Sequence, residues 1–536
     1  MFVDLQGTSA LLTRSLRIDA RTARPHALRA ALLIPVLYFL VVAMELGDLL
    51  GASGLYFFSS LSYLNFALIT LAGTSFFATA ITEEKEESTL GLLRMAGISP
   101  LALLLGKGTT RLIQGVLILS VQLPFTLLAV PLGGITLHQV LATYIALLAY
   151  MLLLSCLGLF WSVACSRSSH AAVATTLCIA VLLFGPWVLG LIWWVVIQSE
   201  IVSTTSTLND IAEGFLLWLT DVSAFHRIGQ ITSSGFSGPL VGTQVLLHAP
   251  TAVILFVASW VSFDWFNREE ISAAPPRGLL PQLRRRHGGQ RSGMSRPGKH
   301  ALAWKDFHFI AGGRQWAIAK LIAYTAICGL IVAAAVTLTP DHSIERQEVA
   351  AAWITIGFFG ICLEVSLMSA RIFHEETRWK TLSMLVMLPA SIRQLAYEKI
   401  AGFPLGLTPG ALVLPAGILL APLQFGEMIY EIITNLWHWV WIAQLILFWH
   451  LVAWGSLQIK WGALPLAIAI VLFGDFIAQI STMIAFVVLF GASGNSIPDE
   501  RFILYVLPLF FTCGQLLLAA LLHLGIGKQL HDQAAA

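Results

Sequence analysis

The chain has 536 residues, of which 57% are hydrophobic and only 11% are charged. A soluble globular domain carries about 25% charged residues, and a disordered chain combines low hydrophobicity with high charge, so both classes are excluded. The formal net charge of +2 provides no general attraction to polyanions, so no nucleic-acid partner is expected. The composition therefore indicates a polytopic membrane protein.

Long apolar segments recur along the whole chain. A membrane-spanning helix requires about 20 mostly apolar residues, and twelve segments approach this length. In chain order they are residues 31–48, 57–80, 112–131, 140–164, 171–195, 242–263, 317–338, 350–370, 401–422, 434–458, 462–490 and 502–525. We therefore predict an all-α fold with twelve transmembrane helices.

The basic residues predict the orientation of these spans, because Lys and Arg accumulate on the cytoplasmic side of a membrane. With the N-terminus inside and twelve crossings, 28 of the 31 Lys and Arg residues fall on the cytoplasmic side. The exceptions are Arg227, Arg346 and Arg501. This distribution predicts a multi-pass protein of the inner (plasma) membrane with both termini in the cytoplasm.

A polar stretch rich in Pro, Gly and Arg divides the predicted spans into two groups of six. We predict a first six-span unit at residues 1–264, a cytoplasmic linker at 265–300 and a second six-span unit at 301–536. Each unit begins with a basic amphipathic stretch, at residues 11–24 and 301–314. The outside segment at 198–242 is expected to contain a short amphipathic or re-entrant helix.

The two units share an internal repeat at an offset of 292 residues. Residues 83–107 align without a gap on residues 375–399, and nine of these 25 positions are identical. The identical pairs are Glu83/Glu375, Glu84/Glu376, Thr89/Thr381, Leu90/Leu382, Leu93/Leu385, Met95/Met387, Ser99/Ser391, Leu103/Leu395 and Lys107/Lys399. General hydrophobicity does not produce matching acids and lysines, so we interpret the halves as repeated units in the same orientation.

Each copy of the repeat is predicted to form a short cytoplasmic helix, at residues 83–96 and 375–388. Two acids begin each helix, where they interact favourably with the positive end of the helix dipole. Leucines three residues apart follow on one face. Such a helix either lies on the lipid head groups or docks into a groove on a cytoplasmic partner. An anionic leaflet would repel the acids at positions 83, 84, 86 and 87, which favours docking.

The run from Thr82 to Pro100, TEEKEESTLGLLRMAGISP, and the following Lys107 resemble the permease subunits of ABC-2 type transporters. In that family two glutamates, a Thr-Leu pair and leucines follow the second span, and a lysine opens the third. The resemblance implies coupling helices that bind two separate cytoplasmic ATP-binding subunits. The residues implied in this contact are Glu83, Glu84, Thr89, Leu90, Leu93, Glu375, Glu376, Thr381, Leu382 and Leu385.

The second copy departs from this pattern. Arg378, Trp379 and Lys380 replace two acids and a serine, and Pro389 replaces Gly97. The contacts of the second copy are therefore expected to differ from those of the first.

We expect no catalytic site, no cofactor and no metal in this chain. Residues 293–300 approach the phosphate-binding loop pattern, but His300 stands where a Ser or Thr hydroxyl must hold magnesium. A metalloprotease pattern begins at His374 but has Arg378 in place of the second histidine. The six cysteines lack metal-ligand spacing. ATP hydrolysis is therefore expected in a partner subunit.

Two acids lie midway along predicted spans, Glu364 in the eighth and Asp475 in the eleventh. Ionisable groups inside a membrane are costly, so they are candidates for function. One interpretation is a proton relay; the other is a hydrogen-bonded acid that supports the bundle or lines a pathway. The offset places Ala72 opposite Glu364, so this acid does not belong to the repeat.

Together these features predict a fused ABC-2 type permease, with export of an unidentified substrate as the expected activity. One alternative is a twelve-span, ion-coupled secondary transporter, which the acidic loop after the second span disfavours. The other is a membrane scaffold without transport, which the internal repeat disfavours.

Overall fold

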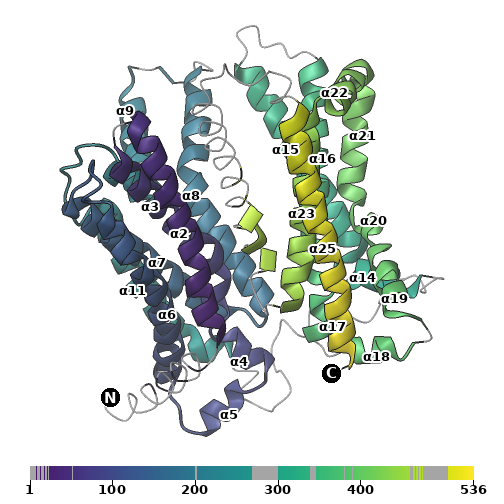
Figure 1. The fold of residues 1–536 in the computed structure, drawn as a ribbon, viewed down its shortest axis with the longest axis horizontal. Helices are drawn as coiled ribbons and strands as arrows, with labels where there is room; N and C mark the ends of the chain where they lie inside the picture. Colours follow the sequence, from purple (N-terminus) through teal and green to yellow (C-terminus); the bar gives the residue numbers. More distant parts are fainter. Residues whose placement is uncertain are drawn as a thin grey trace. The chain divides into compact units, whose positions relative to one another are not determined.

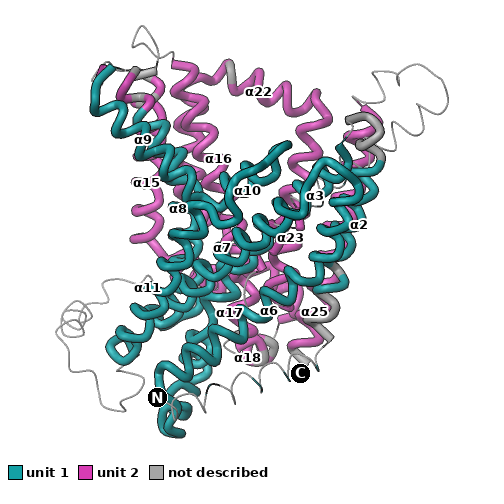
Figure 2. The backbone as a smooth tube through the Cα atoms, turned by 90° about the vertical axis from the view of Figure 1, so that its left-hand side faces the viewer, with its two compact units in different colours: residues 1–193, 204–290, 473–486 teal, residues 194–203, 291–472, 487–536 magenta. Residues whose placement is uncertain are grey.

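The computed structural model describes residues 23–50, 52–198, 202–203, 205–267, 300–338, 346–378, 381–388, 390–458 and 505–535, with single residues or short runs in 8–21 and 463–478. Over these residues the chain forms α-helices and no strand. Two compact units are distinguished in Figure 2. Unit 1 comprises residues 1–193, 204–290 and 473–486, and unit 2 comprises 194–203, 291–472 and 487–536.

Unit 1 is a bundle of long helices with two short helices, α4 and α5, at one end (Figure 1). Its helices are α2 Ala23–Leu50, α3 Ser53–Ala78, α4 Thr82–Glu86, α5 Leu90–Met95, α6 Pro100–Leu128, α7 Leu137–Ala164, α8 Ser168–Gln198, α9 Thr207–Val222, α10 Ala224–Ile231 and α11 Thr243–Phe266. The last residues of α8 are grouped with unit 2.

The core of unit 1 forms where α3 packs on α7. Close approach of the two helices depends on glycine, because a Cβ at Gly158 would lie 2.9 Å from the backbone nitrogen of Ala78. Phe77 and Leu154 fill the space beside this contact and are buried. Small residues let membrane helices approach in this way.

Unit 2 contains a second set of long helices, with α14, α17, α18 and α19 near one end and α22 at the other (Figure 1). Its helices are α14 Ala301–Phe309, α15 Gly313–Leu338, α16 Arg346–Arg371, α17 His374–Arg378, α18 Leu382–Val386, α19 Ile392–Ile400, α20 Phe403–Gly406, α21 Thr408–Leu420, α22 Pro422–Thr434, α23 Leu436–Gln458 and α25 Leu507–Ala535.

Helices α16 and α21 pack backbone against backbone. A Cβ at Gly357 would lie 2.6 Å from the backbone nitrogen of Leu414, and one at Gly417 would lie 2.8 Å from that of Ile354. The helix pair α19–α20 and α21 is bent by 51° at Leu407, so this predicted span is interrupted. Pro409 follows the bend in the first turn of α21, a position where its missing N–H is not needed.

Nine helices in the described part of the chain are long and apolar enough to cross a membrane, and the bent pair gives a tenth candidate. Helix α2 covers the first predicted span, but only Leu32–Met44 is recorded there, as a shorter apolar helix. Most of the predicted span at 462–490 lies outside the described residues, as do the basic stretch at 11–24 and the linker at 265–300, apart from a few positions. The all-α, many-helix prediction is therefore confirmed, whereas the count of twelve spans remains a prediction.

The segment at 198–242, which the sequence predicts to lie outside the membrane, contains the short helices α9 and α10. Ser206 caps α9 by accepting a hydrogen bond from the backbone N–H of Asn209 at 3.2 Å. The Trp193 indole N–H of α8 donates to the side-chain amide oxygen Oδ1 of Asn209 at 3.0 Å. Leu208 and Ile211 remain exposed on α9.

Candidate functional site

The repeated segment folds as two short helices and not as one. In unit 1, α4 ends at Glu86 and α5 begins at Leu90. Ser88 between them has a φ of 57°, a left-handed conformation that ends a right-handed helix. The prediction of a continuous helix over 83–96 is therefore wrong.

Unit 2 repeats this arrangement with α17 and α18. Residues 379–380 between these helices lie outside the described part. The predicted helix over 375–388 is thus also replaced by two short helices.

A shared carboxylate holds each segment in shape. In unit 1, Glu84 accepts hydrogen bonds from the Lys107 ammonium and the Thr89 hydroxyl. In unit 2, Glu376 accepts from the Lys399 ammonium at 2.8 Å and from the Thr381 hydroxyl.

We call this arrangement the Glu–Lys–Thr clamp. Its six residues are three of the identical pairs at the 292-residue offset. Charge-assisted hydrogen bonds of this kind are stronger than neutral ones. The sequence repeat therefore corresponds to a repeated hydrogen-bonding arrangement in three dimensions.

The clamp in unit 2 includes two further charges from α14. Lys305 donates to Glu376 at 2.5 Å, and Lys399 donates to Asp306 at 3.0 Å. Glu376, Lys399 and Asp306 are each at most 3% exposed, so these three charges are largely removed from water, whereas the Lys305 side chain is 39% exposed. Burial raises the pKa of the Asp306 carboxyl, and the positive charge of Lys399 opposes this shift. Sequence reasoning missed Lys305 and Asp306, which precede Glu376 by about 70 residues and lie outside the repeat.

In unit 1, further contacts of α4 differ from those described for unit 2. Glu83 pairs with Arg111 at 2.8 Å, and the Arg111 guanidinium lies 5.2 Å from the centre of the Phe76 ring. The Lys85 ammonium donates to the backbone carbonyl oxygens of Val163 at 2.6 Å and Cys165 at 2.9 Å. These bonds fix α4 to α6 and to the C-terminal end of α7.

The arginine of the Glu83–Arg111 pair is not repeated. The offset places Phe403 where Arg111 stands in unit 1. Glu375, which corresponds to Glu83, therefore lies in a different environment from its equivalent.

The predicted leucine ridge faces the interior of unit 1. Leu90 is 1% exposed and belongs to a core cluster with Leu103, Leu104 and Phe263, and Leu93 packs against the same cluster. Leu90 is therefore not available to a partner, contrary to the role predicted for it. Its repeat equivalent Leu382 and the nearby Leu385 are half-buried.

Other apolar side chains of the segment are exposed, and they too follow the offset. In unit 1, Leu92 and Met95 are 59% and 77% exposed. In unit 2, Met384 and Met387 are 70% and 86% exposed. We call these two pairs the exposed apolar pairs; Met95/Met387 is one of the identical positions, whereas Leu92/Met384 is conserved only in character.

Glu364 is buried and bonded within unit 2. Its carboxylate pairs with Lys320 of α15 at 2.8 Å and accepts a hydrogen bond from the Tyr324 hydroxyl at 3.2 Å. The neighbouring positive charge offsets the cost of burying the acid. The ion pair and the hydrogen bond connect α16 to α15, which agrees with the interpretation of Glu364 as a hydrogen-bonded acid that supports the bundle. Asp475, the other candidate acid, lies outside the described residues.

Within the described residues there is no group of three or more His, Cys, Asp and Glu side chains arranged to hold a metal ion. Comparison of the chain with protein-family models, curated proteins and solved structures finds no match. The geometry of the repeated segments and the sequence therefore carry the functional argument.

Proposed function

We propose that this chain is the membrane-spanning permease of an ABC-2 type transporter, with two six-span units fused and separate cytoplasmic ATP-binding subunits. The proposal includes twelve spans, cytoplasmic termini in the inner (plasma) membrane and export as the direction. ATP binding and hydrolysis in two copies of the partner subunit would alternate access to one pathway.

The observation that carries this proposal is the Glu–Lys–Thr clamp, present once in each unit. In unit 1 the clamp joins α4, which follows α3, to the long helix α6, and in unit 2 it joins α17, which follows α16, to the short helix α19. A force applied to the segment from the cytoplasm would therefore pass directly to the spans on either side. Such a rigid connection suits a segment that transmits a conformational change from a partner.

The exposed apolar pairs also support a contact between these segments and a cytoplasmic partner. Each pair stands on a segment in which one glutamate and the threonine are occupied in the clamp, and its apolar side chains are exposed as a contact surface. Side chains this exposed gain free energy when a partner covers them. We therefore assign the partner contact to Leu92, Met95, Met384 and Met387, and a supporting role to the clamp residues.

Co-purification tests the proposal. The chain is expressed with its native gene neighbours, purified in mild detergent and assayed for a bound ATPase. Wild type should retain the ATPase, and the variant L92D/M95D/M384D/M387D should lose it. L208D is the matched control, because Leu208 is 60% exposed and lies on α9, away from α4 and α5 in unit 1 (Figure 1).

A retained ATPase in the fourfold variant would contradict the assigned contact. Absence of any ATPase from wild type would contradict the proposed function. Size-exclusion profiles identical to wild type are required for each variant, so that misfolding is not read as lost binding.

One observation favours the alternative of an ion-coupled secondary transporter. The buried Glu364 and the partly buried Lys320 provide an acid and a base within apolar helices, as proton-coupled carriers require. Transport driven by a proton gradient without ATP would support this alternative over the ABC-2 proposal.

A further inference from the structure

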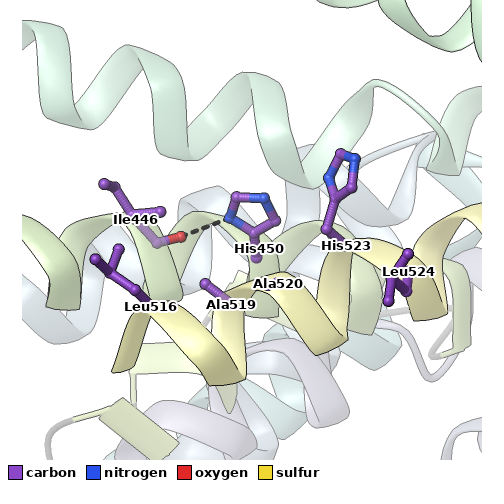
Figure 3. Close-up of a pocket in the computed structure, with 7 residues that line it drawn as sticks. All are labelled: Ile446, His450, Leu516, Ala519, Ala520, His523 and Leu524. Carbon is purple, nitrogen blue, oxygen red and sulfur yellow. Dashed lines mark hydrogen bonds between the residues drawn. The ribbon is translucent and has the colours of Figure 1, made fainter. Parts of the chain in front are cut away.

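A pocket of unit 2 brings together two histidines from different long helices (Figure 3). It has a volume of about 400 Å³ and lies between α23 and α25. Its walls are Ile446, His450, Leu516, Ala519, Ala520, His523 and Leu524. The two imidazoles are the only titratable side chains among these residues. The other lining side chains are apolar, so among them only the imidazole nitrogens can form hydrogen bonds or coordinate bonds to a ligand.

One nitrogen of each imidazole is already engaged. His450 Nδ1 lies 2.8 Å from the Ile446 carbonyl oxygen, and because a carbonyl can only accept, Nδ1 carries the proton. His523 Nε2 lies 3.2 Å from the Tyr397 hydroxyl of α19. These bonds leave His450 Nε2 and His523 Nδ1 for a ligand. Metal-binding histidines characteristically bond their second nitrogen to a backbone carbonyl or another polar group.

The two rings are placed for a shared ligand. Their centres are 5.6 Å apart with an interplanar angle of 63°. Zn–N bonds of roughly 2.0–2.1 Å in tetrahedral geometry put the centres of two bound imidazoles about 5 to 6 Å apart. In Figure 3 one nitrogen of each ring is turned toward the other ring. Spacing and direction thus both agree with one ion between the rings.

We propose that His450 and His523 bind a divalent first-row transition metal such as Zn²⁺, which joins α23 to α25. Neutral imidazole suits Zn²⁺, Cu²⁺ and Ni²⁺, whereas Mg²⁺ and Ca²⁺ prefer oxygen ligands. The pocket is large enough for water to complete the coordination. Tyr397 is a positioning residue, because its hydroxyl orients His523 from α19.

Metal binding to the purified full chain tests this proposal. The chain carries a tag without histidines, is treated with a chelator and is then titrated with ZnCl₂ by calorimetry. We expect saturable binding at one site, weakened at least about tenfold in H450A and in H523A. Y397F should weaken it less, by up to about tenfold, as expected for a second-shell partner. H531A is the matched control, because His531 lies on the same helix α25 and outside the pocket.

Two measurements on wild type alone keep the proposal testable if the variants do not fold. Zn²⁺ should raise the thermal unfolding midpoint, because a ligand that binds the folded state stabilises it. MgCl₂ at the same concentration should leave the midpoint unchanged. No Zn²⁺-dependent rise, no saturable binding, or equal binding in wild type and H450A/H523A would each overturn the proposal.

Discussion

Glu376 accepts a hydrogen bond from Lys399 across 2.8 Å, and the same pairing joins Glu84 to Lys107 at positions 292 residues earlier. The two pairs differ in burial. The Lys399 side chain is 3% exposed, whereas that of Lys107 is 26% exposed. The repeated pairs should therefore respond differently to the same substitution.

Removal of the lysine should destabilise unit 2 more than unit 1. K399M leaves Glu376 and Asp306 buried without their shared cation, which should cost about 3–5 kcal/mol, as for other buried pairs broken from one side. K107M should cost less, because water reaches its site. Thermal unfolding of both variants in detergent, with K528M on α25 as a control, checks this order. Equal shifts for K399M and K107M would contradict it.

The threonine of the clamp should contribute through its hydroxyl. T381V removes a donor to the Glu376 carboxylate and should cost about 1.5–3 kcal/mol, the usual net value of a hydrogen bond to a charged group. T381S retains the hydroxyl and should remain close to wild type in thermal unfolding. If T381V and T381S unfold at the same temperature, the hydroxyl does not contribute as proposed.

The contact between α16 and α21 should not accept a side chain at Gly357. G357L would overlap the Leu414 backbone and should cost at least about 1–3 kcal/mol through overpacking. Gly329 of α15 provides the control, because nothing lies within 4 Å of a Cβ built there. The yield of monodisperse protein should fall for G357L and not for G329L. Comparable yields would argue against the close packing of α16 and α21.

The pair of Glu364 and Lys320 should behave as a coupled unit. E364Q leaves the Lys320 ammonium without its anion, so it should destabilise the protein strongly. The double variant K320M/E364Q should cost less than the sum of the two single variants, because neither charge then remains alone. A double-mutant cycle compares the unfolding temperatures of wild type, K320M, E364Q and K320M/E364Q. Additive effects would show that the two residues do not interact.

The sequence predicted the long helices well, because extended apolar runs leave few other structures for the backbone in a membrane. The turn at Ser88 was not predictable in the same way. Serine rarely adopts a positive φ, and the preceding Glu86 and Glu87 are good helix formers. The break between α4 and α5 depends instead on the tertiary contacts that hold both helices.

Identity between repeats did not distinguish buried from exposed positions. Leu90 and Met95 are both identical to their equivalents, yet Leu90 is buried in unit 1 and Met95 is exposed. A repeated core residue and a repeated contact residue produce the same sequence match. The clamp residues were detectable because they recur at the same offset, whereas their hydrogen bonds to one another and the pairing of Asp306 with Lys399 could not be predicted without the fold.

The most direct test of the proposed function is site-specific photocrosslinking from the exposed apolar pairs. A photoreactive amino acid replaces Met95, Met387 or, as the control, Leu208, and intact membranes are irradiated before purification. The proposal predicts an adduct with the same ATP-binding subunit from positions 95 and 387 and none from position 208. An absence of ATPase adducts from both methionine positions, or equal adducts from position 208, would contradict it.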